Sequence, residues 1–159
     1  MPSFKPEKKF MLLAIAKASE GIRKGQTPFG ACIVRRGKAV ACEHNRVWAD
    51  TDITAHAEIV ALRRACKKLG KLDLSDCVIY STLEPCPMCF SAIHWARIPF
   101  IVYGASIADA KRVGFNELEI SNEKMKKSGG LGVKLAKGFM KKECVSLFRE
   151  WDARKGKPY

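Results

Sequence analysis

The chain contains ITAHAEIVALRRACKKLG at residues 53–70 and TLEPCPMCF at residues 82–90. The first stretch repeats apolar residues at three- and four-residue steps and ends in Gly70, which predicts a helix over 54–69. A short apolar strand, CVIYS (77–81), follows it. The second stretch opens another helix, because its internal proline suits a first helical turn. Helix, strand and helix in succession are typical of an α/β fold.

The same alternation extends through the rest of the chain. Helices are predicted at residues 7–24, 87–97, 106–113 and 144–155, and strands at 29–34, 39–42, 100–104 and 133–140. The first two of these strands flank Arg-Arg-Gly-Lys, which predicts a hairpin. We therefore expect helices on both faces of a mixed sheet, in one domain that spans residues 1–159.

Composition narrows the class of protein. The 159 residues are 47% apolar, and no apolar run approaches the length that spans a bilayer, so we expect no membrane partner. The first ten residues, MPSFKPEKKF, lack the long uncharged stretch of a secretory signal, which favours a cytoplasmic location. Seven cysteines, an odd count, argue against a disulfide framework, and the close pair Cys86 and Cys89 indicates metal or redox chemistry.

The net charge of +13 is compatible with binding nucleic acid or another polyanion. The most basic part is residues 121–159, with eleven Lys and Arg against four Asp and Glu. The basic runs are scattered, however, and no aromatic residues are interleaved with them. This pattern is more typical of solvated surfaces than of a nucleic-acid interface.

His56, Cys86 and Cys89 form a candidate zinc site, because a catalytic zinc takes three protein ligands and keeps a fourth position for water. The two cysteines stand three apart at a helix start, so their sulfurs share one face. His56 and Glu58 are two apart in a helix and point to nearly opposite sides. Both can serve one ion only if the ion lies beyond the first turn of that helix.

The site would then face two helix N-termini, whose partial positive charge lowers the pKa of nearby thiols. Two thiolates offset much of the zinc charge and weaken its effect on water, so a nearby base should help. Glu58 is the carboxylate placed to take the proton without being a ligand. A structural zinc site would instead need a fourth ligand, and neither His44 nor His94 falls in a second paired spacing.

The pattern H-x-E with P-C-x-x-C is the signature of zinc nucleobase deaminases. Through His56-Ala57-Glu58 and Pro85-Cys86-Pro87-Met88-Cys89, the sequence resembles the cytidine and deoxycytidylate deaminase family over nearly its whole length. The resemblance implies a three-layer α/β/α sandwich around a mixed five-stranded sheet. It also implies zinc as the cofactor and hydrolytic deamination of a base as the reaction.

Within that family the sequence is most similar to the bacterial-type guanine deaminases, through PFGA (28–31), HWAR (94–97), GFNE (114–117) and the terminal Tyr159. This likeness implies conversion of guanine, as a small-molecule substrate, to xanthine and ammonia.

The likeness also implies roles for individual residues in binding the base. Phe29 and Trp95 would wall the base, Asn45 would bind the ring edge, and Glu117 would accept its N–H groups.

The resemblance further implies a homodimer in which the C-terminal segment, 121–159, crosses to a partner whose site receives Tyr159. Position alone suggests two further contacts. The backbone N–H of Ala57 and the backbone C=O of Glu84 would hold the ring and its amino group, because the metal ligands fix both peptides nearby.

Other readings remain open. The sequence shares TLEPC (82–86) and ARI (96–98) with tRNA adenosine deaminases, and an RNA substrate suits its net charge of +13. Against this alternative, that branch usually has Val after the proline of PxGA, and its glycine-rich segment has no counterpart in 106–118. Glu117 stands where guanine deaminases commonly have Asp, which is one methylene shorter. Guanosine, another aminopurine or an amino-triazine therefore stay open as alternative substrates.

A non-enzymatic alternative is a basic RNA-binding module in which zinc has only a structural role.

Overall fold

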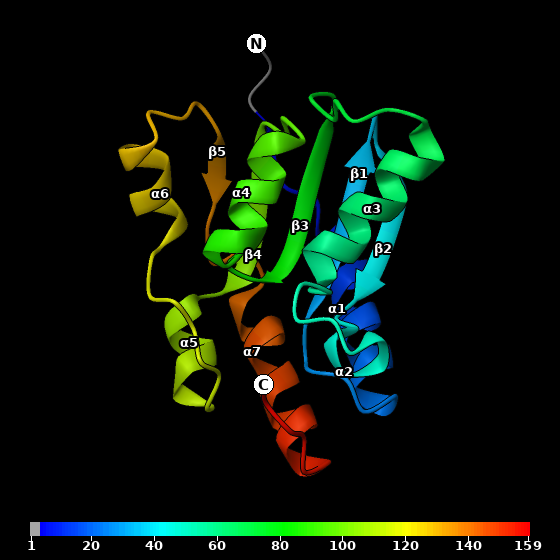
Figure 1. Cartoon of the computed structure of the whole chain (residues 1–159), viewed down its shortest axis with the longest axis vertical. Helices are drawn as coiled ribbons and strands as arrows, with labels where there is room; N and C mark the ends of the chain where they lie inside the picture. The colour runs from blue at the N-terminus through cyan, green and yellow to red at the C-terminus, as the bar shows by residue number, and fades with distance from the viewer. Residues whose placement is uncertain (1–3) are drawn as a thin grey trace.

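A mixed five-stranded sheet runs through the molecule, with helices against both faces (Figure 1). The structure is a computed structural model and describes residues 4–159. The strands are β1 (Gly30–Arg35), β2 (Lys38–His44), β3 (Cys77–Leu83), β4 (Phe100–Ala105) and β5 (Lys134–Ala136). The helices are α1 (Lys8–Arg23), α2 (Val47–Asp50), α3 (Ala57–Leu69), α4 (Pro87–Trp95), α5 (Ile107–Arg112), α6 (Asn122–Ser128) and α7 (Lys141–Ala153).

The strand order in the sheet is β2-β1-β3-β4-β5. β1 is antiparallel to both β2 and β3, whereas β3, β4 and β5 are parallel. In the middle of the sheet, Ile33, Ile79 and Ile101 stand side by side on neighbouring strands and are at most 1% exposed. The expectation of a mixed five-stranded sheet in an α/β fold is confirmed.

The helices form two layers. α1 packs on β1, β2 and β3, and α7 packs on β4 and on α1. α3 packs on β1 and β2 and contacts α4, and Figure 1 shows these two helices together in front of the sheet. Within residues 4–159, no helix combines the length and the apolar character that crossing a membrane requires.

Local sequence explains the boundaries of several elements. The β1–β2 hairpin turns through Arg36 and Gly37, both with positive φ (49° and 71°), as a two-residue type I′ turn requires. α3 ends at Gly70 in the left-handed conformation. α5 begins with a capping box between Ser106 and Asp109.

The structure differs from the sequence prediction at some helix ends. α3 begins at Ala57 and not at residue 54, because the Asp52 carboxylate accepts hydrogen bonds from the N–H and hydroxyl of Thr54 and holds a loop there. α4 stops at Trp95, since Arg97 has a φ of 62°. The predicted strand at 133–140 has only three residues in strand conformation.

Two helices were not predicted. α2 is a single turn, too short to show a periodic pattern. α6 has the sequence NEKMKKS, whose single apolar residue gives no amphipathic stripe. Both flank the region where α3 and α4 begin, which is where the candidate site lies.

Candidate active site and metal centre

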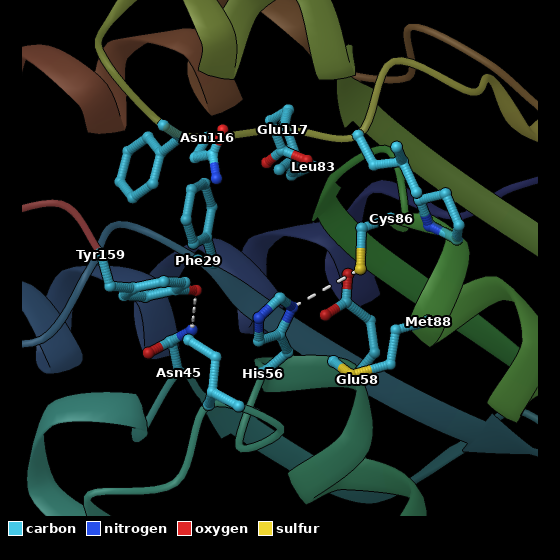
Figure 2. Close-up of a pocket in the computed structure, with 14 residues that line it drawn as sticks. Phe29, Asn45, His56, Glu58, Leu83, Cys86, Met88, Asn116, Glu117 and Tyr159 are labelled. Carbon is cyan, nitrogen blue, oxygen red and sulfur yellow. Dashed lines mark hydrogen bonds between the residues drawn. The ribbon is translucent and has the colours of Figure 1, made fainter.

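A cavity of about 330 Å3 opens where the first turns of α3 and α4 meet (Figure 2). Its walls come from six separate stretches of the chain, the last of which is Tyr159. The lining residues are Phe29, Asn45, Ile53, His56, Glu58, Leu83, Cys86, Pro87, Met88, Phe115, Asn116, Glu117, Leu118 and Tyr159. The parallel strands β3 and β4 end near this region, the usual location of ligand sites in α/β sheets.

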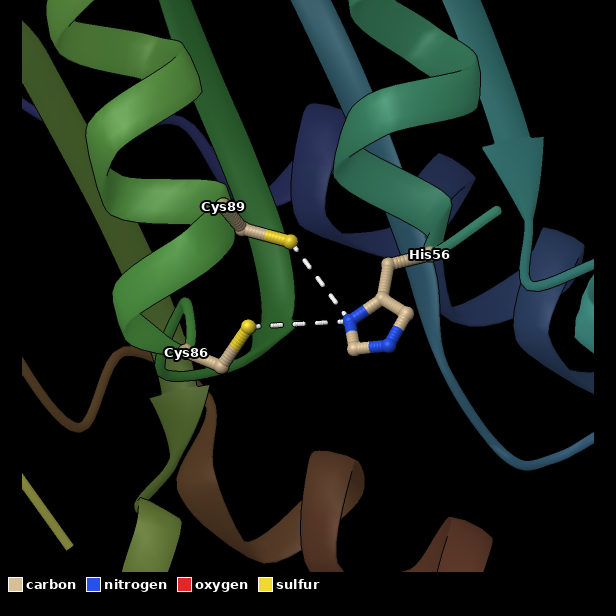
Figure 3. Close-up of side chains that lie close together, drawn as sticks. All are labelled: His56, Cys86 and Cys89. Atoms are coloured by element: carbon tan, nitrogen blue, oxygen red, sulfur yellow. Dashed lines mark hydrogen bonds between the residues drawn. The ribbon is translucent and has the colours of Figure 1, made fainter. Parts of the chain in front are cut away.

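Three candidate metal ligands converge at one side of the cavity (Figure 3). His56 is the N-cap of α3 and Cys86 is the N-cap of α4, so both have extended backbones, and Cys89 lies in the first turn of α4. His56 Nδ1 is 3.6 Å from each of the two sulfurs. The three ligand atoms therefore lie together at the N-terminal ends of α3 and α4.

These distances fit zinc. Bond lengths of about 2.3 Å to sulfur and 2.1 Å to nitrogen at a tetrahedral angle separate the two ligand atoms by about 3.6 Å. Hydrogen bonds from the Cys89 thiol and from His56 lower the pKa of Cys86 to about 4, so that sulfur is a thiolate, as zinc requires. The hydrogen bond to Cys86 and burial raise the pKa of Cys89, so zinc binding there would displace the thiol proton. The N-termini of two helices favour the thiolate form as well. The residues present can thus hold a zinc ion with one open position.

Glu58 lies beside the ligand set without belonging to it. Its side chain is 5% exposed, Ser81 Oγ donates to its Oε1 at 2.8 Å, and the Cys89 thiol donates to its Oε2 at 3.5 Å. Burial raises the pKa of Glu58, and the charge of Cys86 raises it further. A buried carboxyl with a raised pKa next to a metal centre is suited to accept a proton and to release it again.

Asn45 and Tyr159 meet at the other side of the cavity (Figure 2). Asn45 Nδ2 donates to the Tyr159 hydroxyl at 2.8 Å, and Asn45 Oδ1 accepts the N–H of Val47 at 3.0 Å. These two contacts fix the amide orientation and leave a second N–H on Nδ2 to face a base. Tyr159 here comes from the same chain, since α7 packs on α1 and β4 of that chain.

Aromatic side chains form the inner wall. Phe29 is 7% exposed and packs edge to face on Phe115 with ring centroids 4.9 Å apart. The ring of Tyr159 lies 6.0 Å from Phe115 and 5.7 Å from the imidazole of His56. A flat base entering the cavity would therefore meet ring surfaces on the side facing away from α4.

Glu117 lies across the cavity from Glu58 (Figure 2). Burial raises its pKa to about 7, with a further contribution from the charge of Cys86. In the ionised form this carboxylate accepts hydrogen bonds, and in the neutral form it can also donate one. Two carboxyls with raised pKa values in one cavity are typical of a catalytic site.

Three residues with expected substrate roles lie outside the cavity lining. Trp95 is 82% exposed, because it lies at the C-terminal end of α4, about 13 Å along the helix from Cys86. The position of Trp95 relative to the cavity of the same chain does not support the expected contact with the base. Ala57 is fully buried as the first residue of α3, whose N–H has no intrahelical acceptor. Glu84 is 5% exposed.

Sequence reasoning did not find Ser81 as the partner of Glu58 or Phe115 as part of the wall. Ser81 has a signal in the sequence, since it is a hydroxyl residue within the apolar strand CVIYSTL and is 1% exposed. Phe115 belongs to GFNE, but its contact with Phe29 joins residues 86 positions apart, which no local pattern encodes.

Comparison with known proteins adds independent information. Residues 5–105 match the family model described as cytidine and deoxycytidylate deaminase zinc-binding region. A guanine deaminase from Bacillus subtilis is 45% identical over 115 residues, which cover 72% of this chain and 74% of that protein. A tRNA-specific adenosine deaminase from Agrobacterium fabrum is 44% identical over 96 residues, 60% of this chain and 63% of the relative.

The solved structures of similar proteins include a guanine deaminase and a tRNA:A34 deaminase. A guanine deaminase from Nitrosomonas europaea superposes with a TM-score of 0.86 at 29% identity, covering 94% of this chain and 86% of that one. A tRNA:A34 deaminase superposes with a TM-score of 0.78 at 31% identity, covering 89% of this chain and 99% of that one.

Proposed function

The chain belongs to the cytidine and deoxycytidylate deaminase family, and from this premise we propose that it converts guanine and water to xanthine and ammonia. It is a zinc-dependent hydrolytic deaminase, as the family match and the His/Cys/Cys group indicate. Guanine as the substrate is supported by the similarity to the guanine deaminase of Bacillus subtilis.

One observation carries the choice of a free base over a base in RNA. Tyr159 lies in the cavity and is bonded to Asn45, and the indole N–H of Trp48 donates to the Lys157 carbonyl at 3.0 Å, which pins the tail beside it. A free purine can bind in a cavity that residues 157–159 close. A nucleotide within a polynucleotide would also need space for its ribose and two phosphates where this segment lies, so the closed cavity favours the free base.

The roles of the chain's residues follow from their placement. Bound zinc supplies the Lewis acidity that activates water. Glu58 takes one proton from the attacking water and delivers it to the ring nitrogen next to the amidine carbon as the oxygen adds to that carbon. It then takes the remaining proton of the added hydroxyl and delivers it to the amino group, so that the C–N bond breaks, ammonia leaves and the carbonyl forms. Asn45 holds the ring edge, Phe29 lies against the ring face, and Glu117 accepts N–H groups of the base. The backbone N–H of Ala57 and C=O of Glu84 complete the proposed contacts.

An ammonia-release assay tests the substrate. The purified protein is given guanine, guanosine, adenine, cytosine and cytidine, with an anticodon stem-loop RNA alongside. We expect the highest kcat/KM for guanine, with xanthine as the product. A higher kcat/KM for any other compound would overturn the assignment of guanine while leaving the deaminase chemistry in place.

Adenosine in tRNA is the second candidate substrate. The net charge of +13 and the similarity to tRNA-specific adenosine deaminases favour it. This alternative predicts inosine in the stem-loop and an RNA affinity that falls steeply with salt. Ammonia from guanine with no inosine in the RNA would exclude it.

A homodimer that exchanges residues 121–159 is also part of the proposal. Tyr159 closes the cavity of its own chain here, and an exchanged dimer would make the same contacts between two chains.

The cytoplasm is the proposed location. All seven cysteines are free thiols, and two of them are candidate zinc ligands, which suits a reducing compartment.

Mixing two inactive variants tests the exchange. One variant carries Glu58→Ala with an intact tail, and the other lacks residues 157–159 but keeps Glu58. After joint refolding, an exchanged dimer regains about a quarter of wild-type activity, since half the dimers are mixed and each recovers one of its two sites. No recovery would refute the exchange, because each chain would then supply its own tail.

A further inference from the structure

A buried carboxylate outside the cavity holds two separate segments of the chain. Glu84 follows β3, and its Oε2 accepts the N–H of Ile107 at 3.2 Å. Its Oε1 accepts the N–H of Asn122 at 2.9 Å and faces the Tyr103 hydroxyl, which donates at 3.4 Å. Ile107 and Asn122 are the first residues of α5 and α6. One side chain thus fixes the starts of both helices.

Asn122 makes a second connection from the same place. Its side chain is fully buried, and its Nδ2 donates to the Pro85 carbonyl at 2.6 Å. Pro85 precedes the metal ligand Cys86. The start of α6 is therefore bonded at two points to the loop that carries the ligand, once through its backbone and once through its side chain.

The segment between the two helices, residues 113–121, carries Glu117 into the cavity. One end of this segment is anchored by Phe115, which packs on Phe29 and is 5% exposed. The other end is held through Asn122. Among residues 4–159, the recorded hydrogen bonds and ion pairs do not involve the Glu117 carboxyl itself. Its position in the cavity therefore depends on how the segment is held at both ends.

We propose that the Glu84 carboxylate and the Asn122 carboxamide are positioning residues, which hold segment 113–121, and with it Glu117, at a fixed distance from the metal loop. The proposal rests on the assigned deaminase function and adds determinants of base binding. It assigns the Glu84 side chain a positioning role, separate from the proposed contact of the Glu84 backbone C=O with the base. Neither side chain contacts the base.

The chemistry of the contacts suggests a conservative substitution. Glu84→Gln preserves size, but its NH2 group must face either the Ile107 N–H or the Asn122 N–H, so one buried donor loses its acceptor. Asn122→Asp similarly replaces the donor to the Pro85 carbonyl by an oxygen. Glu123→Gln is the matched control, since Glu123 is adjacent, about half exposed, and pairs with Lys137 on the surface at 3.2 Å.

Hydrogen–deuterium exchange gives a readout that does not depend on turnover. In zinc-loaded Glu84→Gln and Asn122→Asp, amides of residues 113–121 should exchange at least about tenfold faster than in the wild type, while those of α3 and α4 stay unchanged. Glu123→Gln should match the wild type. Unchanged exchange in both variants would overturn the proposal. If Glu84→Gln does not fold, Asn122→Asp decides it alone.

Steady-state kinetics then test whether the two residues act through Glu117. Glu84→Gln should raise KM for guanine about tenfold with one zinc per chain retained, and should add less than about twofold when Glu117→Gln is already present. A full tenfold effect in both backgrounds, or loss of zinc, would show that Glu84 acts elsewhere and overturn the proposal. If the wild type does not deaminate guanine, the substrate assignment fails. The hydrogen–deuterium exchange measurement still tests the positioning role in that case.

Discussion

Replacing Glu58 by Gln tests the proposed proton transfer most directly. The side chain is 5% exposed, and a glutamine oxygen can still accept the Ser81 hydroxyl at 2.8 Å, so the substitution preserves the local packing. Burial raises the pKa of Glu58, which means that the charged form is costly in the folded protein. A neutral amide should therefore leave the melting temperature unchanged or raise it.

The expected kinetic effect is large. Proton transfer by a positioned side chain contributes a factor of roughly 10²–10⁴ to the rate. Because the same carboxylate serves the water, the ring nitrogen and the leaving amino group, the upper end applies. A 10⁴-fold loss of kcat corresponds to about 5 kcal/mol of activation free energy.

The assay combines ammonia release with zinc analysis and thermal unfolding. Glu43→Gln is the matched control, since Glu43 is 9% exposed, pairs with Arg64 at 3.0 Å and lies outside the cavity lining. We expect full zinc occupancy in both variants and near-normal kcat only in the control. A zinc-loaded Glu58→Gln protein that keeps more than a tenth of wild-type kcat would refute the proton-transfer role.

Four further substitutions give separate tests. Ser81→Ala removes one hydrogen bond to the Glu58 carboxylate, worth about 1 kcal/mol, so kcat should fall about fivefold without loss of zinc; an unchanged kcat would contradict its orienting role. Because the pKa of Glu117 is raised to about 7 from a usual value near 4.5, kcat/KM for guanine should increase as the pH rises through 7, and Glu117→Gln should abolish this dependence. The ionised form destabilises the folded state only as pH rises above about 4.5, so Glu117→Gln should raise the melting temperature at pH 8 and not at pH 4; the reverse order would contradict the shift. Cys86→Ser should lower both bound zinc and activity, as measured by metal analysis, and retention of one tightly bound zinc would argue against this ligand set. Trp95→Ala should leave kcat/KM unchanged because the side chain is 82% exposed, whereas a large loss would restore a role in binding the base.

Some features of the site are local in the sequence and could be predicted from it. His56 and Glu58 stand two apart, and Cys86 and Cys89 three apart, so each pair is placed by its own helix start. The predicted helix at 54–69 began three residues too early, because the Asp52 side chain binds Thr54 and holds the preceding loop. This error moved a helix boundary and left the ligand set intact.

Other features are long-range and have no local signature. Tyr159 bonds to Asn45, a residue 114 positions earlier, and Glu84 bonds to the N–H of Asn122, 38 positions later. The likeness to known deaminases suggested that Tyr159 serves a site, but the partner that it bonds follows only from the way α7 packs. The exposed position of Trp95 likewise depends on the length of α4, since nine residues carry it from the ligand end to the surface.

The sequence by itself determined the α/β class, the candidate zinc ligands and the carboxylate proposed to transfer protons, because helix periodicity and ligand spacing act over a few residues. Only the tertiary structure decided which side chains enclose the cavity and how segment 113–121 is held against the metal loop. Those contacts form between residues that are neighbours only after the sheet and its two helical layers have packed, and the hydrogen bonds of Glu84 and Asn122 exist only in that packed state.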